Sequence, residues 1–139
     1  MKRLASLIAV AAISAAAPAV AGDLDFTFET ARPTGRILVA LYDSQSAYEG
    51  GGAPVRQAAV EVSGPSASAA FDGLAEGDYA MRAFHDVNGD GRMDVNPFGL
   101  PVEPYAFSNN ARGAMGPARW DQARVAVAGA PVVQTISLK

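Results

Sequence analysis

Apolar and polar side chains alternate with a period of two along much of this chain, whereas helical periodicity is almost absent. In the clearest case, polar residues separate Leu24, Phe26 and Phe28, a pattern typical of a strand with one buried face. Residues 36–42 form a longer apolar run that is rich in strand-forming side chains. This run indicates a central strand.

The same criteria predict seven short strands, at residues 24–28, 36–42, 58–62, 68–71, 78–84, 124–127 and 132–138. Turns rich in glycine and proline separate them. We therefore predict an all-β protein that folds as a single antiparallel β-sandwich, immunoglobulin-like or transthyretin (prealbumin)-like. Tyr79 agrees with this prediction, because it follows a glycine turn as in the tyrosine corner of such sandwiches, where the hydroxyl bonds back to the backbone.

Two of the expected connections are long. Residues 43–56 contain three consecutive glycines and predict a mobile loop over one end of the fold. Residues 86–121 contain no convincing strand and predict only a short helical turn near 117–123. A connection of this length is more often functional than decorative. Its aromatic residues can hold the loop against the sandwich, which is the role we predict, or alternatively form a surface on which sugars stack; they are Phe98, Tyr105, Phe107 and Trp120.

The first 21 residues have the three parts of a secretory signal peptide. Lys2 and Arg3 precede an apolar run, and the small residues Ala19 and Ala21 flank a cleavage site before Gly22. The run is too short for a membrane span, which needs about 20 strongly apolar residues. We therefore expect an exported protein, periplasmic or secreted, whose residues 22–139 form one domain.

The net charge and the absence of cysteine exclude several classes of function. The chain has 11 basic and 14 acidic residues, and loss of the two basic residues of the leader leaves a net charge of −5. An acidic chain without clustered Lys and Arg argues against a nucleic-acid partner. Since the chain has no cysteine, zinc fingers, iron–sulfur sites, thiol redox chemistry and cysteine nucleophiles are excluded.

Oxygen-bearing side chains recur at every second position directly after one predicted strand. Asp86, Asn88 and Asp90 come first, then Gly91, and Asp94 lies three residues further on. Alternate residues of a tight loop can direct their oxygens at one Ca²⁺, and glycine suits the sharp bend. Carboxylates held 5–6 Å apart repel one another by roughly 3 kcal/mol per pair at an effective dielectric near 20. The spacing therefore predicts a calcium-type loop.

The remaining positions follow a calcium loop only in part. Arg92 takes the position that donates a backbone carbonyl, and Asp94 the one that binds directly or through water. Pro97 stands where an EF-hand has its bidentate glutamate, so we expect Glu103, or less favourably Asn96, to complete the ligand set. Such an incomplete set predicts a Kd on the order of 10⁻⁴ to 10⁻³ M. The alternative is a metal-free polar turn, since Asn-Gly and Asp-Gly are turn dipeptides in their own right.

His85 is the one histidine and directly precedes this loop. A histidine beside a metal can act as a general base. The chain lacks a nucleophile motif such as Gly-x-Ser-x-Gly, so a structural role for the ring is the stronger interpretation. A hydrolase that uses His85 near a metal stays open as an alternative.

Three segments then occur in a fixed order: the turn and tyrosine at 71–80, the acidic loop at 84–94, and Phe-Gly-x-Pro-x-Glu-x-Tyr-x-Phe-Ser-Asn-Asn at 98–110. Together they resemble a bacterial exported family, the domain of unknown function family 2141, over about residues 35–138. The resemblance implies a small secreted or periplasmic β-sandwich and no settled activity, substrate or catalytic residue. The positions that match the family's acidic loop and its glutamate are Asp86, Asn88, Asp90, Gly91, Asp94 and Glu103.

These patterns together predict a calcium-stabilised binding or accessory module of the bacterial envelope, whose partner is a protein or a glycan. No residue is assigned to catalysis. The predicted metal ligands are Asp86, Asn88, Asp90, Arg92, Asp94 and Glu103. The alternatives are a metal-free structural or accessory domain and the hydrolase that uses His85.

Overall fold

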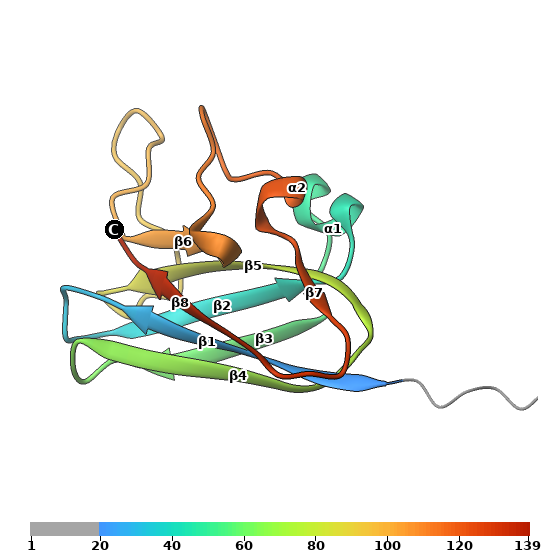
Figure 1. Cartoon of the computed structure of the whole chain (residues 1–139). Helices are drawn as coiled ribbons and strands as arrows, with labels where there is room; N and C mark the ends of the chain where they lie inside the picture. The colour runs from blue at the N-terminus through green and yellow to red at the C-terminus, as the bar shows by residue number, and fades with distance from the viewer. Residues whose placement is uncertain (1–19) are drawn as a thin grey trace, which may run out of the picture.

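The structure, a computed structural model, describes residues 20–139, so the predicted leader lies outside the described residues except for Val20 and Ala21. The described chain is mostly β, with eight strands in two sheets and three short helical segments (Figure 1). The strands are β1 Ala21–Glu29, β2 Arg36–Tyr42, β3 Arg56–Glu61, β4 Ser66–Ala75, β5 Gly77–Asp86, β6 Tyr105–Phe107, β7 Val125–Val127 and β8 Val132–Ser137. The helical segments are α1 Gln45–Gly50, the 3₁₀ turn η1 Ser108–Asn110 and α2 Trp120–Ala123.

The first sheet has the strand order β4-β1-β8. β1 is antiparallel to β4 but parallel to β8, with Phe28 opposite Ile136. The expectation of a wholly antiparallel fold is therefore wrong for this pair. A parallel neighbour requires a long crossover connection, which the second sheet and its loops supply here.

The second sheet has the order β3-β2-β5-β6, and β7 pairs with the start of β5. β2 lies between β3 and β5 and spans residues 36–42, so the prediction of a central strand at these residues is confirmed. Cross-strand neighbours of Leu38 are Ala59 on β3 and Phe84 on β5. This register decides which side chains share the outer face of the sheet.

The core lies between the two sheets and is built from the alternating positions. β1 contributes Leu24, Phe26 and Phe28, β2 contributes Ile37, Val39 and Leu41, and β5 contributes Tyr79, Met81 and Ala83. Burial of each large apolar side chain contributes about 1.5–3 kcal/mol. The Tyr79 hydroxyl donates a hydrogen bond to the Ala75 carbonyl at 2.8 Å, which confirms the predicted bond back to the backbone.

Two segments differ from their predictions. The connection at 43–56, predicted to be a mobile loop, contains α1, which Ser44 caps through its hydroxyl and Gly51 ends in a left-handed conformation. Burial of Tyr48 fixes this helix. The long connection at 86–121 contains β6, whereas its predicted helical turn is confirmed as α2.

A third layer covers part of the outer face of the second sheet. α1, α2 and two long loops lie on this side (Figure 1), around a small cluster that includes Tyr48, Phe107 and Ala118. The Tyr48 hydroxyl donates to the Ala118 carbonyl at 2.9 Å, and the Trp120 ring meets Tyr48 edge-on. Phe107 and Trp120 therefore hold the long connection down, as predicted. None of the helices in residues 20–139 has the length and apolar character to cross a membrane.

Candidate functional site

The acidic loop folds back onto the buried carboxylate of Asp86, at the end of β5. Oδ2 of Asp86 accepts hydrogen bonds from the Gly91 N–H at 2.8 Å and from Nε–H of Arg36 at 3.4 Å. Oδ1 accepts the N–H of Asp90 at 3.1 Å. Gly91 has φ of 80°, a left-handed conformation that suits glycine, so the predicted sharp bend is present.

These hydrogen bonds favour the ionised form of the Asp86 carboxyl. Burial raises the pKa of its carboxyl, but the N–H groups of Gly91 and Asp90 and the guanidinium of Arg36 outweigh burial and lower the pKa overall. Arg36 lies directly opposite Asp86 in the register of β2 and β5. Sequence reasoning missed this partner, because the register was not known.

Glu103 closes the acidic loop from the far side. Its carboxylate is buried, and Oε1 accepts the Val87 N–H at 3.1 Å while Oε2 accepts the Asp94 N–H at 3.2 Å. One side chain thus joins both arms of the loop. Glu103 stands beside the loop, and both of its carboxylate oxygens accept backbone N–H groups.

The rest of the predicted ligands cluster on the exposed side of the loop. Asn88 Nδ2 donates to Asp94 Oδ2 at 2.7 Å and to Asp90 Oδ2 at 3.4 Å. Burial, followed by the negative charges of Asp90 and Glu103, raises the pKa of Asp94. At Asp94, therefore, burial and the neighbouring negative charges outweigh the hydrogen bond from Asn88.

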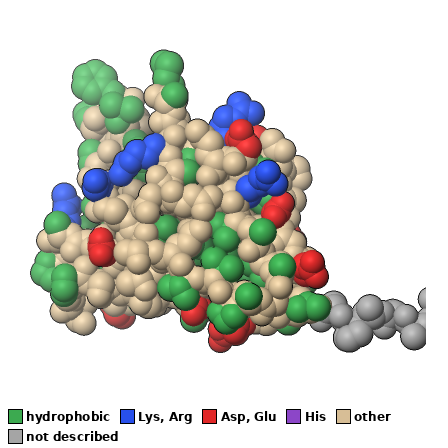
Figure 2. Space-filling view, viewed as in Figure 1, with side chains coloured by type: hydrophobic (Ala, Val, Ile, Leu, Met, Phe, Trp, Pro, Cys, Tyr) green, Lys and Arg blue, Asp and Glu red, His purple; other side chains and the backbone are tan. Residues whose placement is uncertain are grey.

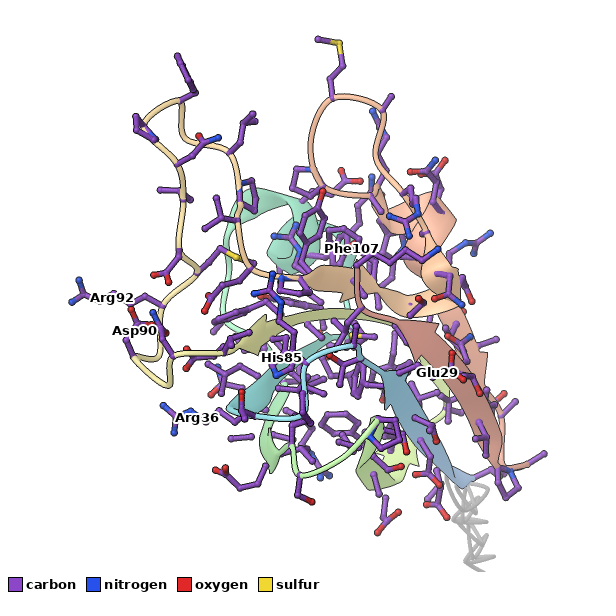
Figure 3. All side chains as sticks on the ribbon, turned by 90° about the vertical axis from the view of Figure 1, so that its left-hand side faces the viewer. Glu29, Arg36, His85, Asp90, Arg92 and Phe107 are labelled. Carbon is purple, nitrogen blue, oxygen red and sulfur yellow. The ribbon has the colours of Figure 1, made fainter. Side chains whose placement is uncertain are left out.

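The donor chemistry suits a hard cation, since every predicted ligand atom is an oxygen. In the structure these oxygens serve hydrogen bonds, and Asn88 directs its NH₂ group toward Asp94. No three His, Asp or Glu side chains of residues 20–139 are grouped as a metal-binding set. Arg92 donates its N–H to Asp90 Oδ1 at 2.9 Å, and its side chain points away from the loop (Figure 3). Five of the six predicted ligands thus share one loop and Glu103 lies beside it, without a gathered set of carboxylates.

His85 is fully buried against the connection between β1 and β2, and both of its ring nitrogens have partners. Nε2 lies 2.6 Å from the Thr34 carbonyl and Nδ1 lies 2.9 Å from Thr30 Oγ1. A carbonyl only accepts, so Nε2 carries a proton and Nδ1 can accept the hydroxyl of Thr30. This arrangement leaves no exposed ring nitrogen for a substrate and gives His85 a structural role.

A cleft of about 1020 Å³ lies on the outer face of the second sheet, between the acidic loop with residues 95–101 on one side and residues 113–117 on the other. Both loops rise from the sheet in Figure 3. Sequence reasoning missed the cleft, because its walls belong to segments that are distant along the chain.

The floor of the cleft consists of two rows of cross-strand neighbours. The row nearer the acidic loop is Ala59, Leu38, Phe84 and Tyr105. The row nearer α1 is Gln57, Ala40, Arg82 and Phe107. The small side chains of Ala40, between Gln57 and Arg82, and of Ala59, at the end of the other row, leave the floor open.

Exposed apolar side chains lie at the tips of the two loops beside the cleft. Phe98 is 89% exposed, Leu100 is 61% exposed and Met115 is fully exposed. Figure 2 shows hydrophobic side chains at the tips of both projecting loops. Exposed apolar groups gathered at one end of a protein mark a binding surface. Phe98 therefore does not hold its loop against the sheet, which corrects its predicted role.

The segment Ser108-Asn109-Asn110 fixes the elements behind the cleft. The Ser108 hydroxyl accepts the Met81 N–H at 2.9 Å and donates to the Ala123 carbonyl. Asn109 donates to the carbonyls of Gln122 and Arg124, each at 3.0 Å. Asn110 adopts positive φ and its amide bonds the backbone of β8. These residues were noted in the sequence without a role, and the structure gives them a bracing one.

The fold and this loop define a mostly β protein in which a strand, not a helix, leads into the acidic loop. Residues 29–135 match the sequence model of a family described as an uncharacterized protein conserved in bacteria (DUF2141), and the chain belongs to this family. The resemblance inferred from the sequence is thereby confirmed. Searches of the curated proteins and of the solved structures each found no match.

Proposed function

We propose that this protein is an exported binding module of the bacterial envelope, and that its cleft holds an apolar group of its partner. The observation that carries the proposal is the cleft of about 1020 Å³ between the second sheet and the two projecting loops. Ligand sites are concave and mostly apolar, with a few polar groups and volumes of about 300–1,000 Å³. An apolar floor favours a protein or lipid-like group over a bare glycan.

The same protein would be a two-sheet sandwich that carries a removable leader. The two sheets pack as an immunoglobulin-like or transthyretin-like sandwich, for which the Tyr79 bond to Ala75 is the best support. Residues 1–21 act as a leader that is removed before Gly22. β1 begins at Ala21, so cleavage before Gly22 removes only the first residue of this strand.

A calcium ion in the acidic loop would hold one wall of the cleft in place. Asp86, Asn88, Asp90, Asp94 and Glu103 would supply side-chain oxygens and Arg92 its carbonyl. Support comes from the raised pKa of Asp94, which reflects burial and the charges of Asp90 and Glu103. A divalent cation would relieve this local excess of negative charge. Binding and ordering of the loop would then be one free-energy change.

Thermal melts in millimolar calcium and in chelator test the metal. We expect calcium to raise Tm, magnesium to do so less, and Asp90→Ala to abolish the increase. Arg56→Ala, an exposed position on β3, serves as the control that keeps the full response. Identical melts with and without calcium would remove the metal from the proposal and leave the cleft.

The second candidate is a metal-free accessory module. It is favoured by the hydrogen bonds that already engage Asp86, from Gly91, Asp90 and Arg36. Under this candidate the loop is rigid without an ion. Backbone amide exchange in the loop would then be slow in chelator and unchanged by calcium.

A further inference from the structure

The cleft carries one charged group, and that group lies at one end. Of the described residues that line it, Arg82 alone is charged. Arg82 projects from β5 beside Ala40 and Phe107. The opposite end, toward the acidic loop, is formed by apolar side chains such as Leu38, Phe84 and Leu100. The cleft therefore has a cationic end and an apolar end.

The guanidinium of Arg82 is held in place but keeps free donors. It lies 4.3 Å from the centroid of the Tyr48 ring and 5.8 Å from that of Tyr42. Nη2 donates to the Tyr48 carbonyl, whereas Nε is buried and has no partner among the described residues. Guanidinium has five N–H donors in a fixed fork. Among the described residues, no hydrogen bond engages Nη1, which leaves its donors for a ligand.

No carboxylate of the described residues forms an ion pair with Arg82. The ion pairs there join Arg36 to Asp86, Arg119 to Asp121 and Arg124 to Asp78. The Trp120 N–H at 2.9 Å, a Gln45 amide hydrogen at 3.1 Å and, more weakly, the nearby charge of Arg82 lower the pKa of Glu49. Glu49 is thus close to Arg82 without forming an ion pair with it. An arginine that is positioned without an anion matches a ligand that brings one.

We infer that the cleft binds an amphiphilic acid, a long-chain carboxylate whose head group pairs with Arg82 and whose apolar chain lies over Leu38 and Phe84 toward Leu100. This inference rests on the proposed function of the cleft as a binding site. The Gln57 amide, next to Ala40 in the same row, is placed to donate a second hydrogen bond to the head group. The loop tips then cover the chain.

Isothermal titration calorimetry with three probes tests this inference. Dodecanoate, below its micelle concentration, supplies head and chain, dodecanol supplies the chain alone, and acetate supplies the head alone. We expect dodecanoate to bind about tenfold or more tightly than dodecanol, since a charge-assisted hydrogen bond contributes about 1.5–3 kcal/mol. Acetate should show no measurable binding.

Two variants separate the head group from the chain. Arg82→Met should reduce the affinity for dodecanoate to that for dodecanol and leave dodecanol unchanged. The matched control Arg124→Met, at an exposed arginine outside the cleft, should change neither. Ala59→Phe, at an exposed position of the floor, should weaken both probes without touching Arg82, so the test survives even if Arg82→Met fails to fold.

The outcomes distinguish this inference from its rivals. Equal affinities for dodecanoate and dodecanol, or no binding of either, would overturn it. Adsorption to phosphatidylglycerol vesicles that persists in Arg82→Met and Ala59→Phe would assign the apolar loop tips to a membrane surface instead. A calcium-dependent Tm without dodecanoate binding would defeat only the ligand, whereas dodecanoate binding without any calcium response would defeat only the metal.

Discussion

Glu103 accepts the backbone N–H of Val87 at 3.1 Å, across a separation of 16 residues. The same carboxylate accepts the N–H of Asp94 at 3.2 Å. One buried side chain thus ties the start of the acidic loop to its second arm. The loop depends on this residue for its shape whether or not an ion is bound.

Glu103→Ala should therefore loosen the loop and lower the free energy of unfolding by about 1–3 kcal/mol, since two amides lose their acceptor. Urea unfolding measures the stability, and hydrogen exchange measures the amides of Val87 and Asp94. Glu61→Ala, at an exposed position on β3, should stay within about 0.5 kcal/mol of the parent. Unchanged exchange at both amides would contradict the bracing role of Glu103.

Asp94→Asn should raise Tm at pH 7 in chelator. The pKa of Asp94 is raised above its usual value of 3.8 by burial and by Asp90 and Glu103. The folded state therefore favours the protonated carboxyl, and the stability it gains at low pH is lost as pH rises through the raised pKa. The neutral amide avoids this loss, so the parent and the variant should converge in acid.

Calcium should reverse the ranking of these two proteins. If the ion is bound as proposed, it stabilises the parent and not Asp94→Asn, which lacks a ligand. Melts of both proteins at pH 7 with calcium and with chelator make the comparison. An equal calcium response in both would show that Asp94 is not a ligand.

Asp86→Asn should reduce the loss of unfolding free energy that the protein shows as pH falls into the acid range. The pKa of Asp86 lies below its usual 3.8, because hydrogen bonds from Gly91, Arg36 and Asp90 outweigh the opposing effect of burial. Its contribution is present above the unfolded pKa and is lost as pH falls through the folded pKa. Unfolding measured from pH 7 to pH 2 should show a loss below about pH 4 in the parent that is smaller in the variant. A parallel pair of curves would argue against this assignment.

His85→Phe should destabilise the fold by about 2–4 kcal/mol, because it keeps an aromatic ring but loses two hydrogen bonds and strands the Thr34 carbonyl. Thr30→Val removes only the bond to Nδ1 and should cost about 1 kcal/mol. Chemical denaturation of the two variants provides the ranking. A well-folded His85→Phe of parental stability would reopen a functional role for the ring.

Much of the fold could be predicted, because alternation along a strand is a local signal. The residues of β1, β2 and β5 that alternate in the sequence are those that fill the core. β6 escaped prediction because three residues are too few to show a period. α1 escaped because its stability comes from a contact of Tyr48 with Ala118, 70 residues away.

The residues of the candidate site also differ in whether a local signal in the sequence could reveal them. Asp86, Asn88, Asp90 and Asp94 lie close together in the sequence, and the structure places them in one loop. Arg36 and Arg82 meet the site only through the pairing of β2 with β5. No spacing in the sequence encodes such a register, so their roles emerge only from the structure.

The parallel pairing of β1 with β8 also fixes when β1 can complete its pairing during synthesis of the chain. Phe28 on β1 finds its partner only at Ile136, near the far end of the described residues. More than 100 residues of chain separate these two positions, and contacts so distant along the chain form slowly. One flank of β1 therefore stays unpaired until β8 becomes available, which leaves that strand edge accessible to a chaperone during this interval.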